Sequence, residues 1–332
     1  MPELHTIGVL TSGGDAPGMN PCIRAIVRTA TAEGIAVIGI RRGYQGLING
    51  DFYQMDSNDV DGISRMGGTI LYTARCEAFL TDEGVDKAAM VCRDLRLDGL
   101  IAIGGDGTMR GAAALAKRGI RVALIPATID KDMGCTEYTI GFDTASNTAI
   151  DAIDRLRDTG QSHERVSVVQ VMGRSAGHLA LYIGLAAGAS AVLLPEKDFD
   201  LEEDVVSVIR RGCLYGRRHH IIVVAEGVGY LNELAKQIEE ATKLETRVTV
   251  LGYIQRGGAP SARDRICGCM MGVRALDCLK NPRLGNRVII VKNGTFNDMP
   301  LEDGVDSSRE FNESMYLACD RIDNSYQHKG RI

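Results

Sequence analysis

Short, continuous apolar runs recur along the chain and predict strands that are buried on both faces. An unbroken run of this kind, rather than an alternating one, is typical of a strand covered by helices on both sides of its sheet. The runs are TIGVL (6–10), AVIGI (36–40), LIAIG (100–104), VALIP (122–126), VSVVQVM (166–172), AVLLP (191–195), HIIVVAEG (220–227), RVTVLGYI (247–254) and RVIIVKNG (287–294).

Many of the segments between these runs carry apolar residues at helical spacing. Examples are Ile23, Ile26 and Val27 in an early segment, and Ile150 and Ile153 in a later one. A repeated strand, helix, strand order indicates parallel sheets with right-handed crossovers. We therefore expect an α/β fold built from doubly wound, parallel-type sheets.

The longest apolar stretch, residues 179–195, approaches the length needed to span a membrane. Gly184, Gly188 and Ser190 interrupt it. A buried helix followed by a buried strand explains this pattern better than a membrane span.

Composition narrows the possible partners. The chain has 332 residues, 45% of them hydrophobic, which suits two domains of about 150 residues each. Its net charge of -5 argues against a general attraction to nucleic acid or to anionic membranes.

The cysteines and the first residues indicate the compartment of the protein. The nine cysteines are scattered and lack zinc-site spacing, so we expect reduced thiols in a cytoplasm. The first residues lack the pattern of a secretory signal.

Glycines follow two of the predicted strands and favour a phosphate ligand. Gly13 and Gly14 precede a helix expected to begin near Gly18, and the GGDG segment at 104–107 precedes one expected near Met109. Glycine lets backbone N–H groups approach a phosphate, and the start of a helix adds positive potential. Neither segment is a Walker A loop, because no Gly-Lys-Ser/Thr follows.

Carboxylates occupy the same strand ends. Asp106 lies in the second glycine loop, and the segment PATIDKD (126–132) places Asp130 and Asp132 directly after a strand. A divalent cation between Asp106, Asp132 and phosphate oxygens would explain acidic residues at an anion site. The alternatives are that Asp106 caps the following helix and that PATIDKD is a solvated turn.

Arginines complete the candidate site. The planar guanidinium suits phosphate oxygens and remains charged, and one such residue alone would be read as solvated. The five arginines in or beside strand-end loops are Arg75, Arg165, Arg174, Arg247 and Arg256. Together they indicate two phosphorylated ligands and hence phosphoryl transfer to an alcohol, with Asp130 as the base.

Seven motifs resemble those of one enzyme family. They are TSGGDAPGMN, GGTILYTAR, GGDGT, TIDKD, RLRDT, VMGRSAG and GYIQRGG. They occur in the same order as in the bacterial-type 6-phosphofructokinases, from about Ile7 to beyond residue 300. The resemblance implies Mg²⁺-dependent phosphorylation of fructose 6-phosphate by ATP in a cytoplasmic homotetramer whose active sites are completed across subunits.

The same resemblance implies the domain organisation. Two α/β domains would have the active site in the cleft between them. The nucleotide domain would comprise 1–141 and 256–305, and the sugar-phosphate and effector domain 142–255 and 306–332.

Residue by residue, the resemblance assigns three groups. Those expected at the nucleotide and its magnesium are Gly13, Arg75, Cys76, Gly105, Asp106, Gly107 and Thr108, with Asp106 on the metal. Those expected to carry the chemistry are Thr128, Asp130, Asp132 and Arg174. Those expected around the sugar phosphate are Thr128, Ile129, Asp130, Met172, Gly173, Arg174, Glu226, Tyr253 and Arg256, with Arg165 and Arg247 lent by a neighbouring subunit.

Departures from the family pattern bear on the phosphoryl donor. Ala127 and Lys131 replace a glycine and an asparagine, and Tyr253 replaces a histidine. Diphosphate-using relatives carry aspartate at the position of Gly107 and lysine at that of Ala127, and this chain has neither. The resemblance therefore favours ATP, with diphosphate as the alternative donor.

An effector site is also implied, and it departs further from the pattern. Ser57 stands where an arginine is common and Ser190 where a glutamate is, so control by effectors is expected to be altered or absent. The implied cationic residues are Arg24, Arg28, Arg157, Arg217, Arg218 and His219. The alternative is that residues 217–220 form a solvated basic turn.

Two rival functions share part of this evidence. NAD and diacylglycerol kinases also contain GGDGT, but their second domain is rich in strands, whereas residues 142–255 predict alternating strands and helices. A catalytically silent nucleotide-binding protein is the other rival. It would not need the combination of Asp106, Thr128, Asp130 and Arg174.

Overall fold

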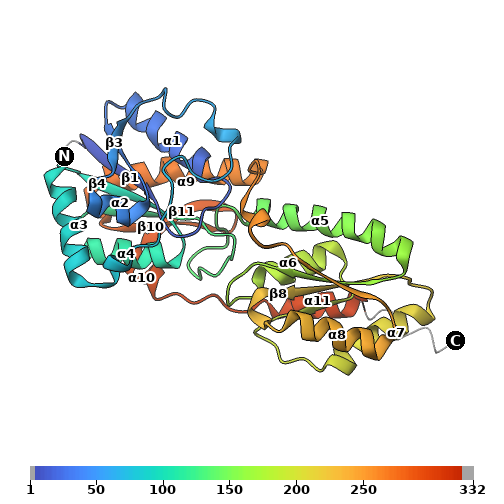
Figure 1. Ribbon diagram of the computed structural model, residues 1–332. Helices are drawn as coiled ribbons and strands as arrows, with labels where there is room; N and C mark the ends of the chain where they lie inside the picture. Colours follow the sequence, from blue (N-terminus) through green and yellow to red (C-terminus); the bar gives the residue numbers. More distant parts are fainter. Residues whose placement is uncertain (1–3, 324–332) are drawn as a thin grey trace. The chain divides into compact units, whose positions relative to one another are not determined.

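The computed structural model describes residues 4–323 and divides into two compact units. Unit 1 contains the chain up to Thr144 together with Arg256–Arg309, and unit 2 contains Ala145–Gln255 together with the residues from Glu310 on. Each unit is therefore built from two separate stretches of sequence (Figure 1).

Unit 1 is organised around a seven-stranded sheet in the order β11-β10-β5-β4-β1-β2-β3. The five inner strands pair in parallel, whereas β3 and β11 pair antiparallel at the two edges. The strands are β1 (Thr6–Thr11), β2 (Ala36–Ile40), β3 (Phe52–Met55), β4 (Gly99–Gly104), β5 (Val122–Pro126), β10 (Arg287–Lys292) and β11 (Thr295–Pro300).

Helices cover this sheet, and α1 packs against α9 (Figure 1). The helices of unit 1 are α1 (Met19–Ala32), α2 (Gly43–Asn49), α3 (Asp82–Asp94), α4 (Asp106–Lys117), α9 (Ala262–Lys280) and α10 (Leu301–Val305). The inner strands β1, β4 and β5 are almost completely buried, as expected for parallel strands covered on both faces.

Unit 2 contains a four-stranded parallel sheet in the order β7-β8-β6-β9. Its strands are β6 (Val166–Val171), β7 (Ala191–Leu193), β8 (His220–Ala225) and β9 (Thr246–Val250). Its helices are α6 (His178–Ala187), α7 (Ser207–Leu214), α8 (Leu231–Thr242) and α11 (Glu313–Asp323), with a π-helical turn at Leu201–Val206. The long helix α5 (Phe142–His163) begins at the end of the first stretch of unit 1 and continues into unit 2.

The α/β fold class with parallel sheets is confirmed, and each of the nine apolar runs overlaps a strand, although several runs extend beyond the end of theirs. The 179–195 stretch is α6 followed by β7, and no helix among residues 4–323 is long and apolar enough to cross a membrane. All nine cysteines are free thiols.

The local structure differs from the sequence analysis in three respects. The edge strands β3 and β11 were missed, because FYQM has only four residues and TFNDMP combines few apolar residues with Asn297, Asp298 and Pro300. The strand β9 is only partly buried, because it lies at an edge of its sheet. The helix after the second glycine loop begins at Asp106 rather than near Met109, which places Gly107 within the first turn of α4.

His220 is a buried polar residue at the start of β8 in unit 2. Its Nδ1 lies 3.2 Å from the Ser190 hydroxyl and its Nε2 lies 3.7 Å from the Cys213 sulfur. Burial lowers the pKa of His220 from 6.5 to about 4, and the nearby charges of Arg217 and His219 act in the same direction. The folded state therefore favours the neutral imidazole.

We expect the stability of the protein to fall as the pH decreases from about 6.5 to about 4. Above pH 6.5 the imidazole is neutral in both states. Between the two pKa values only the unfolded chain binds the proton, which destabilises the folded state by up to about 3 kcal/mol. Urea denaturation of the wild type and of His220→Ala at several pH values checks this. The variant should be less stable at pH 7 and show a weaker pH dependence, whereas His163→Ala, at an exposed position, should retain the wild-type dependence.

Candidate functional site

The topology of unit 1 brings three loops to one edge of its sheet. From β1 the chain proceeds to β2 and β3 on one side, and later forms β4 and β5 on the other. The order of strands therefore reverses between β1 and β4, and ligands of open α/β sheets bind beyond the carboxyl ends of strands at such a point. The segments that follow β1, β4 and β5 are Ser12–Gly14, Gly105–Gly107 and Ala127–Asp130.

Hydrogen bonds join the first of these loops to the start of α4, which follows the second loop, and to the segment that carries Thr73. The Thr108 hydroxyl donates to the carbonyl of Ser12 at 3.0 Å, and the Thr73 hydroxyl donates to the carbonyl of Gly13 at 2.6 Å. Gly13 has a φ of 85°, a conformation that favours glycine. A Cβ on Gly105 would lie 3.4 Å from the Thr128 side chain. Residues Gly13, Gly105, Thr108 and Thr128, all assigned from sequence, are thus neighbours.

Asp106 is the first residue of α4 and does not cap it. The N-cap is Gly105, which provides no side-chain hydrogen bond, so the cap interpretation of Asp106 was wrong. Its carboxylate instead accepts a hydrogen bond from Arg110 at 3.0 Å. Among residues 4–323, no cluster of three or more His, Cys, Asp or Glu side chains could hold a metal.

The segment after β5 carries Thr128, Asp130 and Lys131. The N–H of Asp130 donates to the Thr128 hydroxyl at 3.1 Å, and the Asp130 side chain is buried, so this segment is not a solvated turn. Lys131 has a φ of 54° and places its ammonium 4.4 Å from the centre of the Phe142 ring. Burial, together with the nearby charges of Arg309 and Arg263, lowers the pKa of Lys131 to about 8, and Glu137 opposes this shift.

Arg256 lies against the first glycine loop. Its guanidinium Nη1 is 3.9 Å from Asp15, and a Cβ on Gly14 would lie only 1.8 Å from that nitrogen. Its Nε is buried and has no hydrogen-bond partner among the described residues. Glycine at position 14 therefore leaves the space that Arg256 occupies. Arg75 is exposed, and the neighbouring Cys76 packs against the core of unit 1.

In unit 2, most of the expected sugar-phosphate residues follow the carboxyl ends of adjacent strands. Met172, Gly173 and Arg174 follow β6, Glu226 follows β8, and Tyr253 lies in a short helix after β9. Parallel pairing brings these ends to one edge of the sheet. Tyr253 is 82% exposed, which leaves its hydroxyl accessible to a ligand.

Gln255 links two of these segments and was missed by the sequence analysis. It is fully buried, and its Oε1 accepts the N–H of Met172 at 2.8 Å. A buried amide of this kind fixes the loop that carries Gly173 and Arg174. Its only sequence signal was its place in GYIQRGG.

Arg165 and Arg247 lie on the opposite side of the same sheet, where the amino ends of its strands meet. Arg165 precedes β6 and Arg247 is the second residue of β9, so both are at amino ends of strands rather than at the carboxyl ends where ligands were expected. Both donate to the carboxylate of Glu245. The two arginines lower the pKa of that carboxylate, with the hydrogen bond from Arg165 as the largest cause.

Part of the expected effector group also lies near the amino ends of the strands of this sheet. Nη1 of Arg157 lies 3.4 Å from Nε2 of His219, and Arg217 donates to the carbonyl of Gly188 at 3.3 Å. Burial, together with Arg157 and Arg217, lowers the pKa of His219. Arg218 instead pairs with Glu164. The solvated-turn alternative was wrong for His220, which is buried.

The remaining expected effector residues belong to unit 1. Arg24 and Arg28 lie on α1, and Arg28 pairs with Asp61 at 3.1 Å. The structure therefore does not bring them together with the cluster of Arg157, Arg217 and His219 within one unit.

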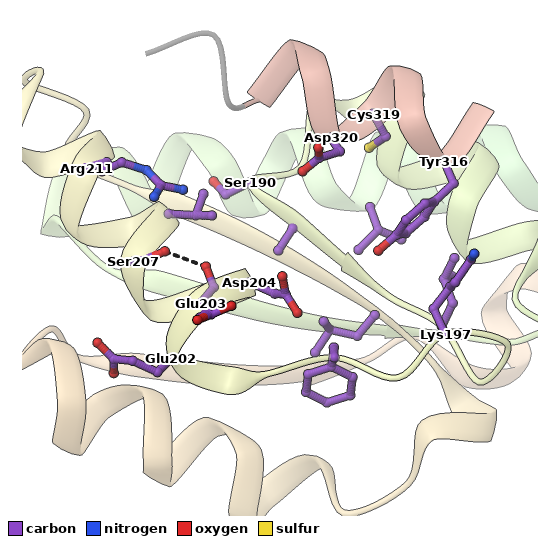
Figure 2. Close-up of a pocket in the computed structure, with 16 residues that line it drawn as sticks. Ser190, Lys197, Glu202, Glu203, Asp204, Ser207, Arg211, Tyr316, Cys319 and Asp320 are labelled. Atoms are coloured by element: carbon purple, nitrogen blue, oxygen red, sulfur yellow. Dashed lines mark hydrogen bonds between the residues drawn. The ribbon is translucent and has the colours of Figure 1, made fainter. Parts of the chain in front are cut away.

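A cavity of about 530 Å³ lies at the β7 edge of unit 2, apart from the residues assigned to substrates (Figure 2). Acidic side chains of the π-helical turn, Glu202, Glu203 and Asp204, line it together with Asp320 of α11. The cationic side chains of Lys197 and Arg211 also line this cavity, so its lining is mixed in charge.

Comparison with known proteins decides the family. The sequence model of phosphofructokinase matches residues 6–279. The chain belongs to the phosphofructokinase family. Over 313 residues it is 50% identical to the ATP-dependent 6-phosphofructokinases of Clostridium botulinum and Clostridium acetobutylicum, covering 94% of this chain and 98% of each relative.

Solved phosphofructokinases share the fold. The enzyme of Saccharomyces cerevisiae superimposes with a TM-score of 0.85 at 31% identity, covering 96% of this chain but 46% of the longer yeast chain. A pyrophosphate-dependent phosphofructokinase from Marinobacter aquaeolei superimposes with a TM-score of 0.81 at 19% identity, covering 93% of this chain and 86% of that one. At that identity the second match is evidence for the fold alone.

The contact between Gly14 and Arg256 predicts a defined effect on this phosphofructokinase. In Gly14→Ala the new Cβ displaces the Arg256 guanidinium, which is expected to bind the sugar phosphate. We expect the KM for that substrate to rise by about tenfold, because one charge-assisted hydrogen bond is lost. Steady-state kinetics with each substrate varied check this. In an Arg256→Lys background the same glycine change should have little further effect, and an equal effect would contradict the steric explanation.

Proposed function

We propose that this chain is an ATP-dependent 6-phosphofructokinase. It transfers the γ-phosphoryl group of ATP to the 1-hydroxyl of fructose 6-phosphate, a step of glycolysis, in the cytoplasm. The observation that carries the proposal is the 50% identity, across 94% of the chain, to enzymes named for this activity. The diphosphate alternative is disfavoured, because glycine at position 107 and alanine at position 127 leave the donor site without the charges of diphosphate-using relatives.

The glycine loops of unit 1 would bind the nucleotide. A Cβ on Gly107 would meet no atom within 4 Å, so this side of the first turn of α4 is open to a ligand. The N–H groups at the start of α4 lack partners within the helix and favour negative charge. These N–H groups, together with Gly13 and Gly105, would contact the phosphates of the nucleotide. Arg75, Cys76 and Thr108 would lie around those phosphates.

The donor set of this loop fits Mg²⁺. Asp106 contributes a single partly exposed carboxylate, and Mg²⁺ commonly binds through one or two carboxylates while keeping waters and substrate phosphate oxygens. Asp106 would hold the ion, which would neutralise phosphate charge when bound. In that state Arg110 would need another partner.

Asp130 would accept the proton of the attacking hydroxyl. The Thr128 hydroxyl accepts its backbone N–H, which restricts the conformation of this segment. A positioned base contributes about 10²–10⁴ in rate. Asp132 and Lys131 would adjust the charge near the transferred group, and Ile129 and Arg174 would contact the sugar and the phosphoryl group.

Unit 2 would supply most of the sugar-phosphate ligands. Met172, Gly173, Arg174, Glu226 and Tyr253 follow strands of one parallel sheet, and Arg256 belongs to unit 1. Arg165 and Arg247 lie at the amino ends of strands in that sheet, away from the carboxyl ends that carry the other ligands. This position supports a role in the active site of another subunit. We accordingly propose a homotetramer that completes its sites across subunits.

The cluster of Arg157, Arg217 and His219 would bind an anionic effector. Ser190, which replaces a glutamate, provides no carboxylate for a metal-bridged ligand, and its hydroxyl lies against His220. Regulation by a metal-bound nucleoside diphosphate is therefore expected to be weak, while an effector bound through its own anionic groups remains compatible with the site.

The donor assay tests the function directly. With Mg²⁺ and fructose 6-phosphate present, the purified protein should form fructose 1,6-bisphosphate with ATP at least about a hundredfold faster than with diphosphate, because the diphosphate-specific charges are missing. Coupled spectrophotometric detection of the product measures both rates. Turnover with diphosphate that matches or exceeds turnover with ATP would overturn the donor assignment.

Replacing the base tests the chemistry. In Asp130→Ser we expect kcat to fall by about 10²–10⁴ while the KM for fructose 6-phosphate changes little, because the carboxylate acts mainly in the transition state. Substrate titrations of both proteins separate the two parameters. A kcat within a few-fold of the wild type would remove Asp130 from the mechanism.

Mixed oligomers test the shared sites. Arg165→Ala should raise the KM for fructose 6-phosphate at least about tenfold, because a charge-assisted contact is lost. Co-assembling it with Asp130→Ser should restore some sites that combine an intact Arg165 with an intact Asp130. If mixtures show only the sum of the two parent activities, each subunit works with its own arginine.

A further inference from the structure

The segment that carries Thr128 and Asp130 is held by a buried carboxylate to which the sequence analysis gave no role. Asp264 lies in the first turn of α9 and is completely buried. Ser261 caps this helix, and its hydroxyl accepts the N–H of Asp264 at 3.2 Å. The side chain of Asp264 thus plays no part in capping α9.

Both oxygens of the Asp264 carboxylate accept hydrogen bonds from residues 138–144. Oδ1 accepts from the Tyr138 hydroxyl at 2.5 Å and from the N–H of Gly141 at 2.8 Å. Oδ2 accepts from the N–H of Thr144 at 2.8 Å and from the Thr144 hydroxyl. Two of these donors are backbone groups at the start of α5, where negative charge is stabilised.

The contacts between the two helix starts are reciprocal. The Thr144 hydroxyl accepts the N–H of Ser261 at 2.9 Å, and the Ser261 hydroxyl donates to Asp143 at 2.6 Å. Arg263 lies over the Tyr138 ring at 4.5 Å. The approach to α5 is therefore fixed from several directions by the first turn of α9.

The fixed segment runs beside the end of β5. The Thr139 hydroxyl donates to the carbonyl of Thr128 at 2.7 Å, and the N–H of Ile140 donates to the carbonyl of Pro126 at 3.1 Å. The Thr128 hydroxyl in turn accepts the N–H of Asp130. A continuous series of hydrogen bonds and short backbone links thus joins Asp264 to the proposed base.

We propose that Asp264 is a positioning residue for phosphoryl transfer. It holds residues 138–141 against the end of β5 and thereby fixes Thr128 and the Asp130 carboxylate before substrate binds. This role rests on the proposed function, in which Asp130 takes the proton. It requires no contact between Asp264 and a substrate.

The experiment compares three variants of the full-length protein. Asp264→Asn replaces an acceptor oxygen by an amide that cannot accept, and Thr139→Val removes only the hydroxyl that contacts Thr128. The matched control is Asp298→Asn on β11, a buried carboxylate of the same unit that pairs with Arg274 and Arg287. The control should destabilise unit 1 without changing the segment after β5.

The positioning role predicts a loss of kcat with unchanged substrate affinity. Per folded molecule, measured by circular dichroism, kcat should fall by about 10- to 100-fold in Asp264→Asn and by about tenfold in Thr139→Val, because a small misplacement of a reacting group is costly. Both KM values should stay within about threefold. The control should keep the wild-type kcat per folded molecule.

A second readout tests whether the loss acts through the base. In an Asp130→Ser background, Asp264→Asn should lower kcat no further, since a misplaced base and a missing base are not additive. A full additional loss, or a wild-type kcat in folded Thr139→Val, would overturn the positioning role while leaving the function intact. If Asp264→Asn does not fold, Thr139→Val decides the question by itself. An inactive wild type would contradict the proposed function and this role together.

Discussion

Parallel pairing of β1, β4 and β5 is the constraint on which the candidate site depends. Parallel strands end at the same edge of a sheet, so segments distant in sequence meet there without any long-range signal of their own. The first two loops contribute glycines before helices, and the third contributes Thr128 and Asp130. Helices on both faces of the sheet bury these strands and thereby fix the three ends relative to one another.

An acidic chain can bind anions only where cations are concentrated locally. Several of the basic side chains expected to contact phosphates are already paired with acids: Arg256 with Asp15, and Arg165 and Arg247 with Glu245. A bare arginine cluster would destabilise the empty protein through repulsion. These carboxylates keep the charge balanced, and an arriving phosphate would take over the same donors. All three pairs keep part of their surface in contact with solvent, and ion pairs near the surface contribute little to stability, so exchanging partners costs little.

The sequence was sufficient for the fold class, for nine of the strands and for the family, because continuous apolar runs and seven ordered motifs are strong signals. It failed at β3 and β11, two short segments without a continuous apolar run, which pair with β2 and β10 at the edges of the sheet. It also failed at residues whose importance lies in a tertiary contact. Asp264 was passed over, and Gln255 was noted only as a letter in a motif, since nothing local distinguishes a buried hydrogen-bonding side chain from an exposed one. Arg165 and Arg247 were correctly recognised as strand-end residues, although the runs that begin at residues 166 and 247 already place them at amino ends.

The discontinuous composition of unit 1 has a consequence for how the chain is made. Its sheet includes β10 and β11, which leave the ribosome only after the whole of residues 145–255. Until β10 is synthesised, β5 presents an unpaired edge next to the proposed catalytic segment, and α1 lacks its packing partner α9. An apolar, unpaired edge invites association with other chains. The nascent chain therefore exposes this edge for longer than a protein whose units are contiguous in sequence.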